Sequence, residues 1–190
     1  MLRLHEIHPS VVHFPLTLVP LTLALDAIGW LTDRPAFCDT ARALMPVATA
    51  SALVAGTAGL LAQESVQAEG KAHDLLVTHR NLNLGLTGIV AGLTAYRMSR
   101  SEPTAGYLLT GLLGVLGMTY TAYLGGKMVY ARRVGVEPDG VRPGESPPLA
   151  MRDIKRVART SARHIVEGVE HIAQETRRGE IAPALRESAA

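Results

Sequence analysis

The chain has 190 residues, a formal net charge of +2 and a mean hydropathy of +0.17, a combination typical of a membrane protein with a soluble end. So small a charge argues against nucleic acid as a partner, which would require a strong basic excess. The single cysteine, Cys38, excludes an intrachain disulfide, a cysteine-ligated iron–sulfur cluster and haem attachment through C-x-x-C-H. Any cofactor would have to be held by histidine, tyrosine, carboxylate or backbone groups.

Several stretches of the chain contain no Asp, Glu, Lys or Arg: residues 7–25, 43–63, 81–96 and 103–126. A bilayer crossing takes about 20 mostly apolar residues, so each stretch can supply one crossing if residues 75–77 extend the third. Helices of a soluble bundle would carry charges every three or four residues, and the second and fourth stretches have none. The sequence therefore predicts an all-α integral membrane four-helix bundle within residues 1–136, with helices at about 9–31, 43–62, 75–98 and 106–130.

The first predicted helix begins near Pro9, because proline is well tolerated in a first helical turn. Pro15 and Pro20 lie inside it, and each removes a backbone hydrogen bond, which predicts a kink. His8 and His13 stand at its start. A titratable ring at the edge of an apolar segment is costly unless it faces a partner, a cofactor or water, so this end of the helix is a candidate for function.

Small residues indicate where the predicted helices approach one another closely. The second helix is rich in alanine and glycine, with Ala52 and Gly56 four residues apart. The third helix has the same spacing between Gly88 and Gly92. Such pairs are typical of packing faces between membrane helices, and we interpret them as core contacts.

Beyond residue 136 the composition changes. Residues 137–149 are rich in proline and glycine and predict a linker, while residues 150–178 predict a soluble C-terminal amphipathic helix with one apolar stripe. Basic residues crowd the first half of this helix, so it can lie on an anionic leaflet, which we favour, or pair with another protein helix. Its His164 and His171 are interpreted as solvated, and residues 179–190 as a disordered tail.

An even number of crossings places both termini on the same side of the membrane. That side would hold six basic residues near the membrane, against four on the other: Arg3, Lys71, Arg80, Lys127, Arg132 and Arg133, against Arg34, Arg42, Arg97 and Arg100. The positive-inside rule therefore predicts that both termini are cytoplasmic.

Up-and-down threading of the predicted helices collects most of the unusual polar residues in one leaflet. They lie at the start of the first and third helices and at the end of the second and fourth: His8, His13, Gln63, Glu64, His73, His79, Asn81, Asn83, Tyr123, Lys127 and Tyr130. The sequence thus places the candidate functional site at this end of the bundle.

Three interpretations of these residues stay open. Two histidines on facing helices at similar depth can ligate a six-coordinate b-type haem. For haem, the predicted pair is His13 and His79, and the other candidate contacts are His8, Gly85, Gly125, Gly126, Tyr123 and Lys127. A divalent metal would instead use imidazole and carboxylate ligands, here His8, His13, His79 and Glu64. In the third interpretation, the histidines hydrogen-bond across helices and hold no cofactor.

These interpretations correspond to three functions: a b-type haem protein or membrane redox subunit, a non-catalytic membrane scaffold or assembly protein, and a divalent-metal-binding or ion-transport protein. The sequence contains no recognisable Ser-His-Asp arrangement, P-loop or dinucleotide motif, so an independent enzymatic activity is not indicated. The expected partners are the lipid bilayer, a redox or other membrane protein, and a second copy of the chain.

Two motifs carry a resemblance to a known family. They are His8-Pro9-x-x-Val12-His13-Phe14-Pro15-Leu16 and Gly125-Gly126-x-Met128-Val129-Tyr130, the latter followed by Val134-Gly135-Val136. Over about residues 4–136 the chain resembles the domain of unknown function 2231, an uncharacterised bacterial family of four-helix membrane proteins. The resemblance implies a bacterial cytoplasmic membrane location and a functional pairing of the two motif regions, with no established reaction. Where the family usually reads Tyr-x-His-Gly-Val-Gly-Val, Arg132 here replaces the histidine.

Overall fold

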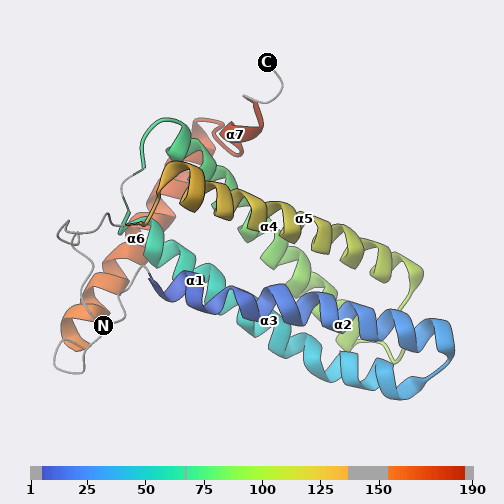
Figure 1. Cartoon of the computed structure of the whole chain (residues 1–190). Coiled ribbons are helices and arrows are strands. Elements are labelled where there is room, and N and C mark those ends of the chain that lie inside the picture. Colours follow the sequence, from blue (N-terminus) through green and yellow to red (C-terminus); the bar gives the residue numbers. More distant parts are fainter. Residues whose placement is uncertain (1–5, 67, 137–153, 187–190) are drawn as a thin grey trace. The chain divides into compact units, whose positions relative to one another are not determined.

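The structure, a computed structural model, describes residues 6–66, 68–136 and 154–186, without the side chain of Arg186. These residues form helices and contain no strand, which confirms the prediction of an all-α chain (Figure 1). The helices are α1 (Ile7–Val11), α2 (His13–Thr32), α3 (Pro35–Gln63), α4 (Lys71–Met98), α5 (Ala105–Arg132), α6 (Ile154–Arg177) and α7 (Pro183–Arg186). The predicted linker, residues 137–149, lies outside the described residues.

The first predicted helix is divided in two at Val12. Helix α1 ends at Val11 and α2 begins at His13, so Pro15 lies in the first turn of a new helix. A proline ring clashes with the carbonyl group four residues earlier, which for Pro15 belongs to Val11, and a first turn is where proline is tolerated. The sequence predicted a disturbance of this helix at Pro15, and the structure has a one-residue interruption at Val12, whose backbone keeps helical angles of φ −61° and ψ −24°.

Helix α3 begins at Pro35, whereas the sequence predicted a loop there and a helix from about residue 43. The turn before it is short because Asp33 ends α2 in the left-handed conformation, with φ of 52°. Gly29 then lies against the start of α3: a Cβ atom there would be 2.9 Å from the backbone nitrogen of Cys38. The absence of a side chain at Gly29 therefore allows α2 and α3 to meet in a tight hairpin.

The described chain divides into two compact units, and α3, α4 and α5 each run through both. Unit 2 consists of Val11–Ala55 and Asn83–Tyr120. Its core is formed by Val19, Leu23, Met45, Ala48, Val90, Leu93, Tyr107 and Met118. Large apolar side chains are also exposed on its surface, including Leu31, Leu53, Val54, Leu109, Leu112, Leu113 and Leu116. So many exposed apolar side chains suit a solvent of lipid rather than water.

Unit 1 consists of Met1–Ser10, Gly56–Leu82 and Thr121–Ala190. It has a smaller apolar core, in which Leu75, Leu124 and Met128 are buried and Val134 and Ala184 pack against them. Several polar contacts also lie in this unit. They form the candidate site described below.

Three helical segments are long and apolar enough to cross a membrane: Ile7–Thr32, Pro35–Gln63 and Ala105–Arg132. Helix α4, the fourth predicted crossing, does not meet this criterion. Its polar side chains, among them Arg80, Asn81, Asn83 and Arg97, lower its hydropathy. By length and composition alone, three crossings are therefore supported.

The glycines that pack closely against another helix are not the ones that the sequence predicted. A Cβ atom at Gly56, Gly88 or Gly92 would meet nothing within 4 Å among the described residues. In contrast, a Cβ atom at Gly117 would be 2.9 Å from the side chain of Leu86. Four-residue spacing identifies glycines that share a helix face, but it does not say which face meets a neighbouring helix.

Candidate functional site

Two histidine rings meet in unit 1. His8 lies on α1 and His79 on α4, and both side chains are partly buried. Their ring centroids are 6.3 Å apart, and the ring planes are nearly perpendicular, at 88°. The sequence nominated both residues, but it paired His79 with His13.

The ring of His79 is held in one orientation by α5. Its Nδ1 lies 2.9 Å from the carbonyl oxygen of Thr121, a residue that is 2% exposed. A carbonyl group can only accept, so Nδ1 carries the proton and donates it, and the lone pair of the neutral ring is on Nε2. Metal-binding histidines are commonly oriented by a donated Nδ1 hydrogen bond of this kind.

Glycines lie against both rings. A Cβ atom on Gly125 would be 3.2 Å from Cε1 of His79, and a Cβ atom on Gly59 would be 3.2 Å from Cε1 and Nδ1 of His8. Gly125 was predicted to provide clearance at this site. Gly59 was not singled out, because it lies in a run of small residues that was interpreted as helix packing.

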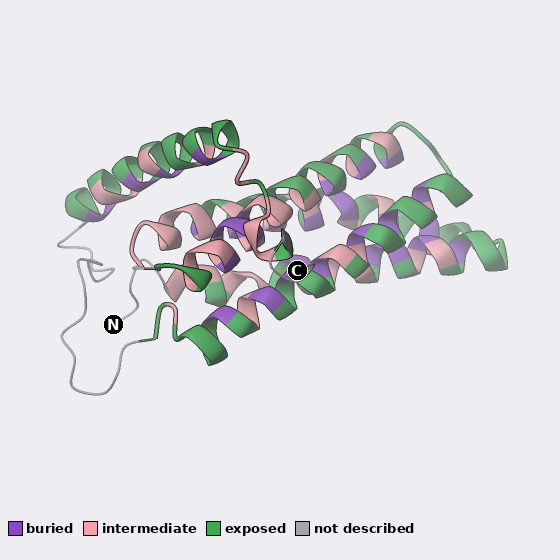
Figure 2. Ribbon diagram, turned by 90° about the horizontal axis from the view of Figure 1, so that it is seen from above, coloured by how far each residue is buried: buried purple, intermediate pink, exposed green. Residues whose placement is uncertain are grey.

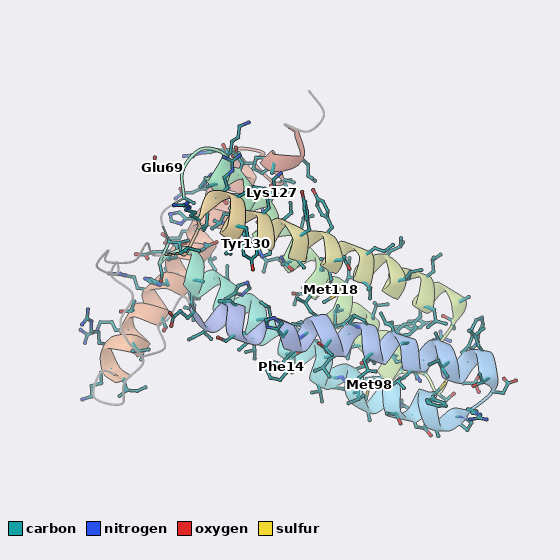
Figure 3. All side chains as sticks on the ribbon, viewed as in Figure 1. Phe14, Glu69, Met98, Met118, Lys127 and Tyr130 are labelled. Atoms are coloured by element: carbon teal, nitrogen blue, oxygen red, sulfur yellow. The ribbon has the colours of Figure 1, made fainter. Side chains whose placement is uncertain are left out.

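The other predicted haem contacts do not join this pair in unit 1. His13 and Gly85 belong to unit 2, and both are exposed. A Cβ atom on Gly126 would meet nothing within 4 Å among the described residues, in contrast to one on Gly125. Tyr123 and Lys127 are exposed near the end of α5, where Figure 3 labels Lys127 beside Tyr130. His8 and His13 are only five residues apart, yet His8 meets His79 whereas His13 is exposed.

The predicted metal ligands do not form a metal site. Among the described residues, no group of three or more His, Cys, Asp or Glu side chains is arranged to hold a metal ion. Glu64 instead accepts hydrogen bonds from Gln63 and from His171 of α6. The interpretation of His8, His13, His79 and Glu64 as a divalent-metal site is therefore not supported, because the carboxylate is used to hold α6.

Helix α6 is bound to the ends of α3 and α4 by polar contacts. His164 is only 4% exposed, and its Nδ1 lies 3.2 Å from the carbonyl oxygen of Leu61 and 3.4 Å from Oγ of Ser65. His171 is paired with Glu64 at 3.0 Å. The expectation of a solvated side chain is wrong for His164, because it considered α6 alone and not the surface that covers it, whereas His171 is exposed as expected and pairs with Glu64 at the surface.

A buried ion pair completes the contact between α6 and α4. Arg80 and Glu175 are each 8% exposed and are joined through Nη2 and a carboxylate oxygen. Arg80 also donates hydrogen bonds to Gln63 and Asn81, at 3.3 and 3.0 Å, and His73 lies 3.7 Å from the same carboxylate. This network lines a cavity of about 390 Å³ between the end of α3, the start of α4 and the end of α6.

The chain after α6 also contacts unit 1. Asn81 donates a hydrogen bond to the carbonyl oxygen of Ile181, and the backbone N–H of Ala184 donates to Oγ1 of Thr78. The sequence predicted disorder from residue 179, whereas residues 179–186 contain α7 and these two contacts. The order of this short segment could not be predicted locally, because the residues that it contacts lie about a hundred positions away in the sequence.

A second buried polar cluster lies in unit 2. Asp26 and Arg97 are 0% exposed, and their carboxylate and guanidinium groups are 2.8 Å apart. The remaining donors of Arg97 reach the carbonyl oxygens of Cys38, Arg100 and Ser101. The hydroxyl group of Tyr107 donates a hydrogen bond to Oδ2 of Asp26, with 3.0 Å between the two oxygens. From the sequence, Arg97 was counted only as a basic residue on the opposite side of the membrane.

Exposed apolar side chains on unit 2, apolar helices of membrane-spanning length and paired buried charges define an α-helical membrane protein. The sequence comparison agrees: residues 4–138 match the model of a family described as predicted membrane proteins, DUF2231. The chain belongs to this family. No curated protein and no solved structure matches the chain.

Proposed function

We propose that this protein is a membrane haem protein, in which His8 and His79 are the axial ligands of one b-type haem and the chain acts as a redox subunit. The observation that carries the proposal is the separation of the two rings, 6.3 Å between centroids. An imidazole nitrogen lies about 2 Å from the metal it binds, so two rings on opposite sides of one ion have centroids roughly 6 Å apart. The observed separation has this value.

The surroundings of the two rings support the same assignment. The hydrogen bond from Nδ1 of His79 to Thr121 directs the ring and favours Nε2 as the ligating atom. Gly59 and Gly125 keep side chains away from the rings, which favours the approach of a flat macrocycle. When bound, the haem would supply one-electron chemistry; the protein would supply the two ligands, their orientation and an environment of low polarity.

Difference spectroscopy tests the haem directly. The protein purified from a haem-sufficient host is expected to show Soret and alpha bands in a reduced-minus-oxidised spectrum. His8→Ala and His79→Ala should each abolish the six-coordinate spectrum, because each removes one axial ligand. His13→Ala is the matched control, since His13 is exposed, and should retain the spectrum.

Neighbouring glycines provide a finer control. Gly125→Ala should perturb the bands or weaken haem retention, because the new Cβ atom crowds His79, whereas Gly126→Ala has open space and should behave as wild type. Absence of both bands from the wild-type protein would refute haem binding. Loss of haem in His13→Ala but not in His8→Ala would refute the proposed ligand pair.

We also propose that α4 is a fourth membrane crossing, which completes a four-helix membrane domain over residues 1–136 with both termini in the cytoplasm of a bacterial cell. The main obstacle to its insertion is the charge of Arg97, and Asp26 of α2 neutralises that charge in a fully hydrogen-bonded pair. Residues 81–96 of α4 contain no charged side chain. An ion pair of this kind favours α4 inside the membrane beside α2.

Reporter fusions test the number of crossings. Four crossings place the two termini on the same side, whereas three place them on opposite sides. Fusions of alkaline phosphatase and green fluorescent protein to each end, made in the full chain, are expected to report cytoplasm at both termini. Opposite locations of the two termini would exclude the fourth crossing.

A membrane scaffold or assembly factor is the second candidate function. It is favoured by the extensive binding of α6 to α3 and α4, which presents a soluble helix at one end of the membrane segments. In this role the pair of His8 and His79 would be a structural contact. A haem-free preparation that co-purifies with a membrane-protein partner or a second copy of the chain, and loses it when residues 150–178 are deleted, would favour this role.

A further inference from the structure

Helix α6 has one face that is buried against the rest of unit 1 and, beside it, a second face of exposed apolar residues. The covered face includes Val157, His164, Gly168 and Glu175, all buried in unit 1. Beside it runs a stripe of exposed apolar residues at steps of three and four, which we call the outer stripe: Ile154, Ala158, Ala162, Ile165, Val169 and Ala173. Figure 2 shows the same division, with buried residues along one side of α6 and exposed residues along the other.

A row of cations borders the outer stripe. Lys155, Arg159 and Arg163 each follow a stripe residue by one position, and Arg156 lies next to them on the helix surface. In residues 154–163 there is no acidic residue. Among the described residues, Lys155, Arg156 and Arg159 have no ion pair, and Arg163 has only an exposed contact with Glu167 at 3.6 Å.

We propose that the outer stripe of α6 lies on an anionic membrane surface, with the stripe in the acyl–headgroup boundary and the cations at the lipid phosphates. Charge complementarity selects this occupant, because four cations without buried partners match the negative potential of an anionic leaflet. The stripe itself is shallow, with three alanines and exposed fractions of 55, 38 and 54% for Ile154, Ile165 and Val169. A shallow stripe with cations beside it suits a lipid interface better than an interdigitating helix pair.

The covered face makes this arrangement specific to the native fold. The contacts of His164, His171 and Glu175 fix the rotation of α6 about its own axis, so the outer stripe has a defined direction relative to the ends of α3 and α4. A helix bound to lipid by its amphipathicity alone would be free to choose its own apolar face. Here the protein contact leaves the outer stripe as the available one.

Lipid quenching tests the proposal in the full chain. In a Cys38→Ala background, a fluorophore is attached at Ala158→Cys on the outer stripe or at Gln174→Cys, an exposed position on a different side of α6. The proteins are placed in nanodiscs of phosphatidylcholine, with or without phosphatidylglycerol, that contain doxyl-labelled lipid. Quenching is expected at Ala158→Cys in the discs with phosphatidylglycerol, and at Gln174→Cys in neither.

Charge variants make the test quantitative. Lys155→Gln and Arg159→Gln should each reduce the ratio of lipid-bound to unbound α6 about fivefold, and high salt should have the same direction of effect. Equal quenching at the two labels, or no response to phosphatidylglycerol, would overturn the proposal. The proposal would also be overturned if the fluorophore at Ala158→Cys were shielded from the lipid quencher by a co-purified protein, because the outer stripe would then bind a protein partner. None of these readouts involves haem, so they are independent of the proposed redox function.

Discussion

Replacement of Asp26 by asparagine is expected to destabilise the protein by about 3–5 kcal/mol, because it leaves the buried Arg97 guanidinium without a counter-charge. Asp26 accepts hydrogen bonds from Nε and Nη2 of Arg97, at 2.8 to 3.0 Å, and from the hydroxyl group of Tyr107. Both members of the ion pair are fully buried. The free energy of unfolding can be measured by titrating the detergent-solubilised protein with sodium dodecyl sulfate.

Control variants separate the ion pair from the general effect of a charge change. Asp39→Asn alters an exposed carboxylate near the start of α3 and should stay within about 0.5 kcal/mol of wild type. The double variant Asp26→Leu with Arg97→Met should recover much of the stability, because it removes both charges instead of stranding one. A wild-type stability for Asp26→Asn would show that the pair does not hold the bundle together.

Replacement of Glu175 by glutamine is expected to release α6, because Arg80 would be left buried without its carboxylate partner. Breaking a buried ion pair of this kind costs about 3–5 kcal/mol, which corresponds to an increase of at least a hundredfold in the population of the released helix. Hydrogen exchange of residues 154–177 measures that population. The amides of α6 should exchange correspondingly faster, while those in the unit 2 parts of α3 and α5 keep their protection.

The same helix provides a matched control. Glu170→Gln removes an exposed carboxylate and should leave the exchange of α6 unchanged. The reversed pair, Arg80→Glu with Glu175→Arg, should restore part of the protection if the charge interaction is the cause. Unchanged exchange in Glu175→Gln would mean that the contacts of His164 and His171 are sufficient to hold α6.

The helical membrane segments could be predicted from the sequence because each depends on local composition. A run without charges identifies an apolar helix whatever packs against it, and Pro15 identified a disturbance of the first helix. The residues at which the helices begin and end were less predictable. Residues 32–40 were interpreted as a loop because of Asp33, Arg34 and Asp39, yet Pro35 is an excellent first helical residue and the helix starts there.

The candidate site was predictable only in part. The two sequence motifs drew attention to His8 and Gly125, and the polar start of the third predicted helix drew attention to His79. Which histidine meets His79 depends on the side of the helix that faces α4, because five residues of helix place His8 and His13 on different sides. The local composition of the sequence does not distinguish His8 from His13, because both are histidines at the start of the same apolar stretch.

By itself the sequence determined that this is an α-helical membrane protein, where its apolar helices lie, and that a further helix follows them, because these properties depend on residues close together in the chain. Only the tertiary structure decided the partners: His8 with His79, Arg97 with Asp26, and Arg80 with Glu175. Each of these pairs joins residues about seventy to a hundred positions apart. A charge or an imidazole is costly to bury alone, so its presence in an apolar helix signals that a partner exists, but only the packing of the helices selects which one.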